Sequence, residues 1–159
     1  MKGKIAHVPS REGAFAVDTS AVISTLQCYL EAKYSLEIAY RSYADRVKGP
    51  WRDSLVSHWY EHAKDEKKSQ YDLAMKIIGL GGDPAVCSIT IPNCTYGLQS
   101  FFMCLMEMEL RAIELGRELI QMSGDNDGLR LLMEEIVLND SHHLDDLKRM
   151  GVVMPESPK

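Results

Sequence analysis

The stretch that decides the fold is DPAVCSITIPNCTYG, residues 83–97, which shows no helical pattern although long periodic segments lie on both sides. Loops of this length inside a compact domain are uncommon and need a structural reason. A helix of about 28 residues is about 42 Å long, and fifteen extended residues reach at most about 50 Å. The stretch can therefore run the length of a helical bundle and set the helix after it parallel to the helix before it.

Start and stop signals divide the rest of the chain into four predicted helices. Asp18 precedes the first periodic segment, and residues 49–50, 81–84 and 123–128 interrupt the periodicity further along. Short turns join the first two helices and the last two, so each pair is expected to form an antiparallel hairpin. The expected fold is all-α: a single-domain four-helix bundle over residues 1–159 with one long crossover between the second and third helices. After an N-terminal extension at 1–18, the helices are expected at about 19–48, 51–80, 98–122 and 128–150.

Composition limits the class of protein. The chain has 159 residues and a mass of 17.9 kDa, which is the size of one domain. Its 45% hydrophobic and 26% charged residues are typical of a globular protein and exclude a disordered one. The net charge of -5 provides no basic surface for a phosphate backbone, so we expect no nucleic-acid partner.

The same sequence indicates the compartment. The longest uncharged apolar run, residues 101–106, is far short of the ~20 residues that span a bilayer, so we expect no membrane segment. Polar residues interrupt residues 1–10 before any apolar segment builds up, which argues against a secretory signal. We therefore expect a cytoplasmic protein with reduced cysteines. Cys87 and Cys94, seven residues apart, could pair or bind metal, but free thiols are the expectation.

Each predicted helix has an inward stripe that is apolar at both ends and polar in the middle. One polar residue on such a stripe is ordinarily exposed or reaches the surface with its charged end. Interruptions at a similar depth in all four helices instead predict a buried polar cluster, in which charges need partners or a metal ion. The interrupting residues are Lys33, His62, Glu66, Ser69, Glu109, Asp140 and His143.

The motifs around these residues resemble those of the ferritin, bacterioferritin and Dps-like superfamily of di-iron carboxylate proteins. The resemblance covers residues 19–150 and implies a ferritin-like four-helix bundle with a metal site at its centre. Residues 26–49 resemble the first helix of the family. EHAKDE (61–66) followed by IIGLGGDP (77–84) is similar to its Glu-x-x-His helix and Leu-Gly-Gly-x-Pro ending, and ELRAI (109–113) and DSHHLDDL (140–147) match the third and fourth helices.

The chain departs from the family pattern at the metal ligands. Lys33 lies seven residues before Tyr40, where the family has a metal-binding Glu, and Ser69 lies three residues after Glu66, where the family has His. The resemblance implies that the first iron site has lost both of these ligands. It also implies that the second site keeps Glu109 and His143, and that Glu66 and Asp140 remain as the carboxylates that bridge the metals, with Asp140 replacing a Glu.

Charge arithmetic suggests what the departure means. The family site has four carboxylates and two divalent ions, whereas three carboxylates and one ammonium leave two negative charges here, which one divalent ion would neutralise. We hypothesise that the Lys33 ammonium occupies the first site and pairs with Glu66 and Asp140. One Fe, Mn or Zn ion would then bind Glu109, His143, Asp140 and Glu66.

Two other states of the centre remain open. Lys33 could clamp the carboxylates without any metal, with one carboxylate holding a proton. A working di-iron centre would need His62 or Glu37 to replace the missing ligands, although both lie at the wrong level. Tyr40 matches the tyrosine that lies near the metal site in the family. It could be redox-active, or it could be a packed core residue without a role in the chemistry. Haem is not expected, because Lys67 stands where haem-binding bacterioferritins carry Met.

Three functions follow from these states. The first is a ferritin-like metal-binding protein with one divalent metal and weak or no ferroxidase activity. The alternatives are a non-catalytic structural or interaction subunit with a salt-bridged, metal-free core, and an iron-storage ferroxidase, which needs two adjacent metals. Outer apolar residues such as Ile38, Trp59 and Ile120 also predict a homo-oligomer of undecided size.

Overall fold

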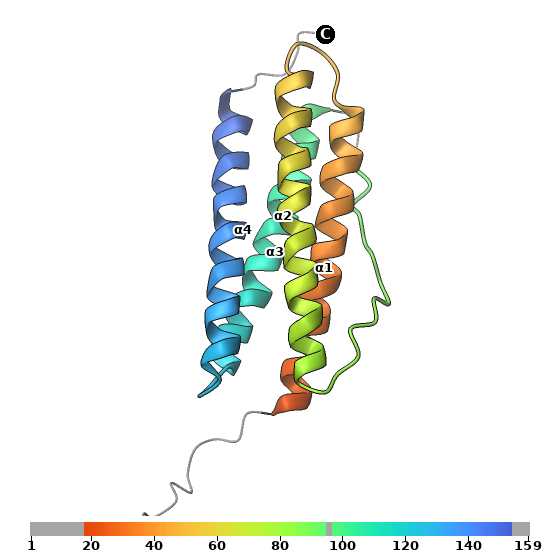
Figure 1. Ribbon diagram of the computed structural model, residues 1–159. Coiled ribbons are helices and arrows are strands. Elements are labelled where there is room, and N and C mark those ends of the chain that lie inside the picture. The colour runs from red at the N-terminus through yellow and green to blue at the C-terminus, as the bar shows by residue number, and fades with distance from the viewer. Residues whose placement is uncertain (1–17, 95–96, 154–159) are drawn as a thin grey trace, which may run out of the picture.

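The computed structural model describes residues 18–94 and 97–153, which form four helices and no strand. Figure 1 shows the helices side by side, with the green crossover running beside α1 and with α2 and α3 pointing the same way. The predicted all-α bundle with one long crossover is therefore confirmed. The expected N-terminal extension lies outside the described residues, apart from Asp18. The helices are α1 (Thr19–Arg46), α2 (Arg52–Gly79), α3 (Leu98–Met122) and α4 (Asp127–Val153).

Local signals in the sequence explain where the helices begin and end. The Asp18 carboxylate accepts hydrogen bonds from the backbone N–H groups of Ser20 and Ala21, which caps the start of α1. At the end of α2, Gly81 adopts a φ of 85°. The N–H of Gly82 then donates to the carbonyl of Ile77 at 2.9 Å, which closes a Schellman motif. The positive φ of this motif falls on Gly81 and favours glycine there.

The core consists of apolar layers above and below the polar middle of the bundle. Most residues of the predicted inward stripes are buried, with one correction at a tryptophan. Trp51 precedes α2 at the end of the bundle and is 37% exposed. Trp59 was expected on the outer surface but is fully buried and packs edge-on against Phe102 at 5.3 Å between ring centroids. Its spacing from Leu55 and His62 places it on the buried face of α2.

The crossover is fastened to α1 by side chains spaced along one face of that helix. A loop that crosses a bundle must find partners for its backbone polar groups, and α1 supplies several of them. Gln27 donates to the carbonyl of Ala85, Glu31 accepts from the N–H groups of Cys87 and Ser88, Ser35 accepts from the N–H of Thr90, and Tyr43 donates to the carbonyl of Pro92.

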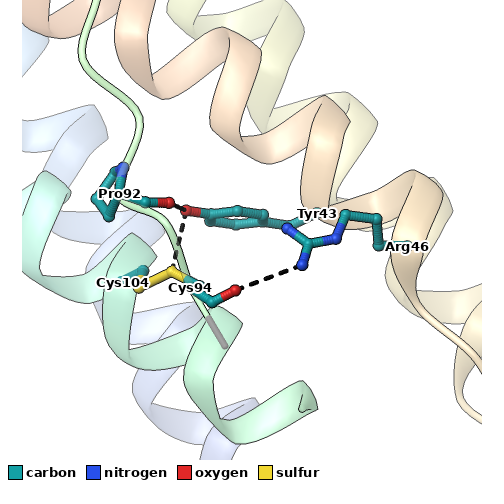
Figure 2. Close-up of a disulfide and its surroundings, with 5 residues drawn as sticks. All are labelled: Tyr43, Arg46, Pro92, Cys94 and Cys104. Carbon is teal, nitrogen blue, oxygen red and sulfur yellow. Dashed lines mark hydrogen bonds between the residues drawn. A yellow bond between two sulfur atoms is a disulfide. The ribbon is translucent and has the colours of Figure 1, made fainter. Parts of the chain in front are cut away.

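A disulfide between Cys94 and Cys104 joins the end of the crossover to α3 (Figure 2). This corrects the expectation of four reduced cysteines, and the partner of Cys94 is not Cys87. The crossover returns alongside the first turns of α3, which brings the two Cα atoms to 6.8 Å, although ten positions separate them in sequence. Tyr43 packs against the disulfide, with its hydroxyl 3.1 Å from the Cys94 Sγ. Cys28 and Cys87 are free and exposed.

The four helices do not pack equally closely. α1 packs along α2 and α3, and α3 packs along α4, whereas α2 and α4 approach each other at only a few residues. A pocket of about 210 Å³ opens between them and is lined by polar side chains that include Asp65, Asp72 and Glu135. None of the four helices is long and apolar enough to cross a bilayer.

Candidate metal centre

The polar residues that interrupt the four stripes meet in the middle of the bundle. Glu66 of α2, Glu109 of α3 and Asp140 of α4 are fully buried, and His143 of α4 is 3% exposed. One possible ligand atom from each of these residues lies within 4.8 Å of the others. The structure therefore brings together all four residues that were expected to bind metal.

Lys33 of α1 lies inside the same cluster and is fully buried. Its Nζ is 2.9 Å from the Oε2 of Glu66 and also contacts the Oδ1 of Asp140, which is the pairing expected from the sequence. Burial lowers the pKa of Lys33, but the charges of Glu66 and Asp140 outweigh this effect and raise the pKa above its usual value. The amine therefore stays charged and sits between the two carboxylates.

His143 connects the other side of the cluster. Its Nδ1 lies 3.0 Å from the Oε1 of Glu66 and 3.2 Å from the Oε1 of Glu109. Burial lowers its pKa, but the bonds to Glu109 and Glu66 prevail and raise the pKa to about 10. At neutral pH, a proton on Nδ1 therefore lies between two carboxylates. The Nε2 faces outward, 3.3 Å from the Oδ2 of Asp65, which lines the pocket between α2 and α4.

The three carboxyl groups respond differently to these neighbours. Burial, followed by the charge of Glu66, raises the pKa of Glu109 to about 7. Burial also raises the pKa of Asp140 and outweighs the opposing charge of Lys33. Although burial acts in the same direction on Glu66, the charges of Lys33 and His143 hold its pKa below the usual value. Glu66 is therefore the firmest anion of the cluster, and Glu109 is the carboxyl most ready to hold a proton.

Two tyrosines of α1 donate hydrogen bonds to the cluster. Tyr40 donates to the Oε1 of Glu109 at 2.5 Å, so it is a partner of the site as well as a core residue. Tyr29 donates to the Oδ2 of Asp140 at 2.7 Å and was not singled out from the sequence. Its position one turn before Lys33 on the buried stripe could have identified it. Asp65 was not identified from the sequence. It directly precedes the inward-facing Glu66 on α2, so it lies off the predicted buried stripe, at the pocket between α2 and α4.

Other candidates from the sequence stay outside the group of four. The ring of His62 is 4.0 Å from that of His143 and nearly parallel to it, and burial lowers the pKa of His62 to about 3. Ser69 donates to the carbonyl of Asp65 in its own helix. Glu37 accepts a hydrogen bond from Gln70 at 2.9 Å. Neither His62 nor Glu37 offers a ligand atom to the central group within the described residues.

Comparison with known proteins agrees with this architecture. The family model for the ferritin-like domain matches residues 23–152. The chain belongs to the ferritin-like family. A crystal structure described as ferritin-like, diiron-carboxylate proteins from Bacillus anthracis str. Ames is 22% identical and superposes with a TM-score of 0.80. The match covers 86% of this chain and 99% of that one, and it shows a shared fold. A search of curated proteins finds no match.

The donors of this ferritin-like centre suit a divalent transition metal. Three carboxylates and one imidazole form a mixed oxygen and nitrogen set. The Oε2 of Glu109 is buried and accepts no hydrogen bond from the described residues, so it is available to an ion. The Nδ1 of His143 faces Glu66 and Glu109 at distances close to the separation of two ligands on one metal. An ion ligated by the Nδ1 of His143 would take the place of the proton on this atom.

Proposed function

We propose that this ferritin-like protein binds one divalent ion, Fe, Mn or Zn, and has weak or no ferroxidase activity. Glu109, Asp140 and His143 would hold the ion, and Glu66 would be shared with the ammonium of Lys33. The observation that supports a single ion is the buried Lys33 Nζ between Glu66 and Asp140. According to the family resemblance, these are the two carboxylates that would bridge a pair of metals.

Charge supports the same stoichiometry. Three carboxylates and one ammonium leave two negative charges, which one divalent ion neutralises. A bound ion would supply Lewis acidity, and Fe or Mn would also supply one-electron redox chemistry, whereas ferroxidase activity uses two adjacent metals. His143 would release its Nδ1 proton on binding, and Tyr40 and Tyr29 would continue to orient Glu109 and Asp140 by hydrogen bonding.

A metal-free core is the second candidate, for a non-catalytic structural or interaction subunit. It is favoured by the way the side chains already neutralise one another. The Lys33 ammonium, a His143 imidazolium and the hydroxyls of Tyr29 and Tyr40 contact most carboxylate oxygens of the cluster. An iron-storage ferroxidase, the third function considered, would require Lys33 to leave the position between Glu66 and Asp140.

Metal content separates these functions. In crystals reconstituted with Fe(II) without oxygen, iron anomalous diffraction should show one ion at the central cluster, and Lys33→Glu should raise this toward two, because it replaces the ammonium with a carboxylate ligand. Lys67→Glu is the charge-matched control at an exposed position and should stay at one. Two ions at the central cluster of the unsubstituted protein, or no change there in Lys33→Glu, would contradict the proposal. A central cluster that takes up no ion under these conditions would support the metal-free core.

Assembly belongs to the proposal as well. Members of this family often form oligomers, and we propose a homo-oligomer of undecided size. Because Trp59 is buried, the support comes instead from Tyr71, Met75 and Ile78, which lie on one face of α2 and are each about half exposed or more. Light scattering with size-exclusion chromatography tests it, and a monomer at micromolar concentration would contradict it.

The cytoplasm remains the proposed compartment, and the Cys94–Cys104 disulfide counts against it, because disulfides are uncommon in reducing compartments. Alkylation of free thiols in intact cells, followed by mass spectrometry, distinguishes the two cases. Four modified cysteines would support a cytoplasmic, reduced chain. Modification of Cys28 and Cys87 alone would indicate an oxidising compartment.

A further inference from the structure

A second group of metal-binding side chains lies between α2 and α4, outside the central cluster. His58 and His62 are separated by four positions and so lie on one face of α2, and Asp146 faces them from α4. One ligand atom from each lies within 4.8 Å of the other two. We propose that these three residues bind a divalent transition-metal ion at the opening between α2 and α4.

The distances within the group fit a metal better than hydrogen bonds. The Oδ2 of Asp146 is 3.4 Å from the Nε2 of His58 and 3.6 Å from the Nε2 of His62. Hydrogen bonds between nitrogen and oxygen are most often about 2.9–3.0 Å long. Metal–ligand bonds of about 2.0–2.2 Å in a tetrahedral site place the ligand atoms about 3.3–3.6 Å apart. The Oδ2 of Asp146 is therefore spaced from each of the two imidazole nitrogens like one ligand of a tetrahedral metal from another.

The remaining contacts of these side chains orient them for this role. The Nε2 of His58 is buried and has no hydrogen-bond partner among the described residues. Arg149 donates to the Oδ1 of Asp146, which holds the carboxylate in place and leaves its Oδ2 directed at the two imidazoles. Such outer contacts to a ligand are typical of metal sites, where they fix the orientation of the binding groups.

Exposure makes the group reachable from solvent. The side chain of His62 is 5% exposed, but those of His58 and Asp146 are 31% and 25% exposed. Three protein ligands leave at least one position of the metal for water. Two imidazoles and one carboxylate favour Zn, Fe, Co or Cu over Ca or Mg, which prefer oxygen ligands.

The proposed site adjoins the central cluster but shares no residue with it. The rings of His62 and His143 are stacked, so the two groups lie on opposite sides of this pair. A metal at His58, His62 and Asp146 and a metal at Glu109 and His143 would therefore use separate ligands. An ion at this site would also tie α2 to α4 at the side of the bundle where these helices make few contacts.

Cobalt titration of the full chain tests the site, because four-coordinate Co(II) has a strong visible absorption. The unsubstituted protein should bind one more Co(II) ion than His58→Gln or Asp146→Asn, and its visible absorption should be stronger than that of either variant by the contribution of this ion. His142→Gln and Asp145→Asn are matched controls at exposed positions of α4 and should behave like the unsubstituted protein. Glu109→Gln should keep the signal, because it alters only the central cluster.

Anomalous diffraction from crystals soaked in Co(II) provides the second measurement. An anomalous peak between His58, His62 and Asp146 would support the proposal. Loss of this peak in Asp146→Asn would show that the Asp146 carboxylate is one of the ligands. Equal Co(II) affinity in the unsubstituted protein and in His58→Gln, or a peak confined to the central cluster, would overturn it. Circular dichroism of each variant identifies any that fail to fold, and His58→Gln, at a partly exposed position, should retain the helical spectrum.

Discussion

At the residue scale, Lys33 is the most unusual feature of the chain. Burying an ammonium costs several kcal/mol, and the cost is offset only when the partners are close and well oriented. Glu66 and Asp140 meet this condition, because both contact the Nζ directly. The same cation protects them, since without it two buried carboxylates would face each other uncompensated.

Replacing Lys33 by Met should therefore destabilise the metal-free protein by about 3–5 kcal/mol, the range observed when one partner of a buried ion pair is removed. Urea unfolding in the presence of a chelator measures the change. Lys67→Met, at an exposed neighbouring position, should change the free energy of unfolding by less than about 0.5 kcal/mol. If both variants were equally stable, the Lys33 ion pairs would not contribute to the fold.

The sequence identified the members of the central cluster but not their protonation. Lys33, Glu66, Glu109 and Asp140 each interrupt an apolar stripe, and the shared depth of the interruptions predicted that they meet. Whether His143 and Glu109 hold protons depends on distances of about 3 Å between residues of different helices, which no periodicity encodes. The contact between Asp65 and the Nε2 of His143 could not be predicted for the same reason.

At the element scale, α3 approaches α4 closely at Gly116. A Cβ at this position would overlap the Cγ2 of Val137 and lie 3.0 Å from the hydroxyl of Tyr29. Val137 is restricted to few rotamers, and Tyr29 is held by its hydrogen bond to Asp140. Gly116 therefore allows the close contact between α3 and Val137 of α4. It also leaves room for Tyr29 to keep its hydrogen bond to Asp140.

Gly116→Ala should lower the free energy of unfolding by about 1–3 kcal/mol through overpacking, although alanine favours a helix by about 1 kcal/mol. Gly79→Ala is the matched control, because a Cβ there meets nothing within 4 Å and the residue is also helical. The control should be neutral or slightly more stable in urea unfolding. A stabilised Gly116→Ala variant would show that α3 and α4 can separate at no cost.

The crossover shows what loop length can and cannot predict. Its fifteen residues indicated a path along the bundle, and residues 80–94 follow that path beside α1. The Cys94–Cys104 disulfide was missed because it depends on how the end of the loop folds back over α3. The burial of Trp59 was misjudged although its spacing from Leu55 was available.

The disulfide should contribute modestly to stability, because it closes a short loop. Loop-closure entropy assigns about 3 kcal/mol to a loop of 15 residues, so the ten-position separation of Cys94 and Cys104 should be worth about 2–3 kcal/mol. A reducing agent should lower the free energy of unfolding of the unsubstituted protein by this amount, seen as a lower urea midpoint, and have no effect on a Cys94→Ser, Cys104→Ser variant. The exposed pair Cys28→Ser, Cys87→Ser should respond like the unsubstituted protein. Equal midpoints with and without reductant would show that the bond does not stabilise the fold.

At the scale of the whole molecule, the central cluster joins all four helices, so its charge state affects the stability of the entire bundle. His143 has a pKa of about 10 in the folded protein against an ordinary value of 6.5. A raised pKa means that folding is favoured while the group is protonated in both states and that this advantage disappears as the pH rises through the folded pKa. The pKa of Glu109 is likewise raised, from 4.5 to about 7, so its contribution to stability also falls as the pH rises through this range.

The metal-free protein should therefore lose stability as the pH rises from about 6.5 toward 10. Urea unfolding at a series of pH values with a chelator measures this loss. His143→Gln should flatten the dependence in this range, whereas His142→Gln, an exposed neighbour on the same helix, should preserve it. Stability that is constant or rises with pH would mean that His143 is not held as an imidazolium.

The uneven packing of the helices has a consequence for kinetics. An atom moving between the centre and bulk water meets packed apolar side chains along every side except the one between α2 and α4. There, Asp65 and Asn139 line the pocket and contact the outward-facing Nε2 of His143. The exchange rate of a central ion should thus be limited by rotation of a few surface side chains, on a timescale far shorter than that of global unfolding.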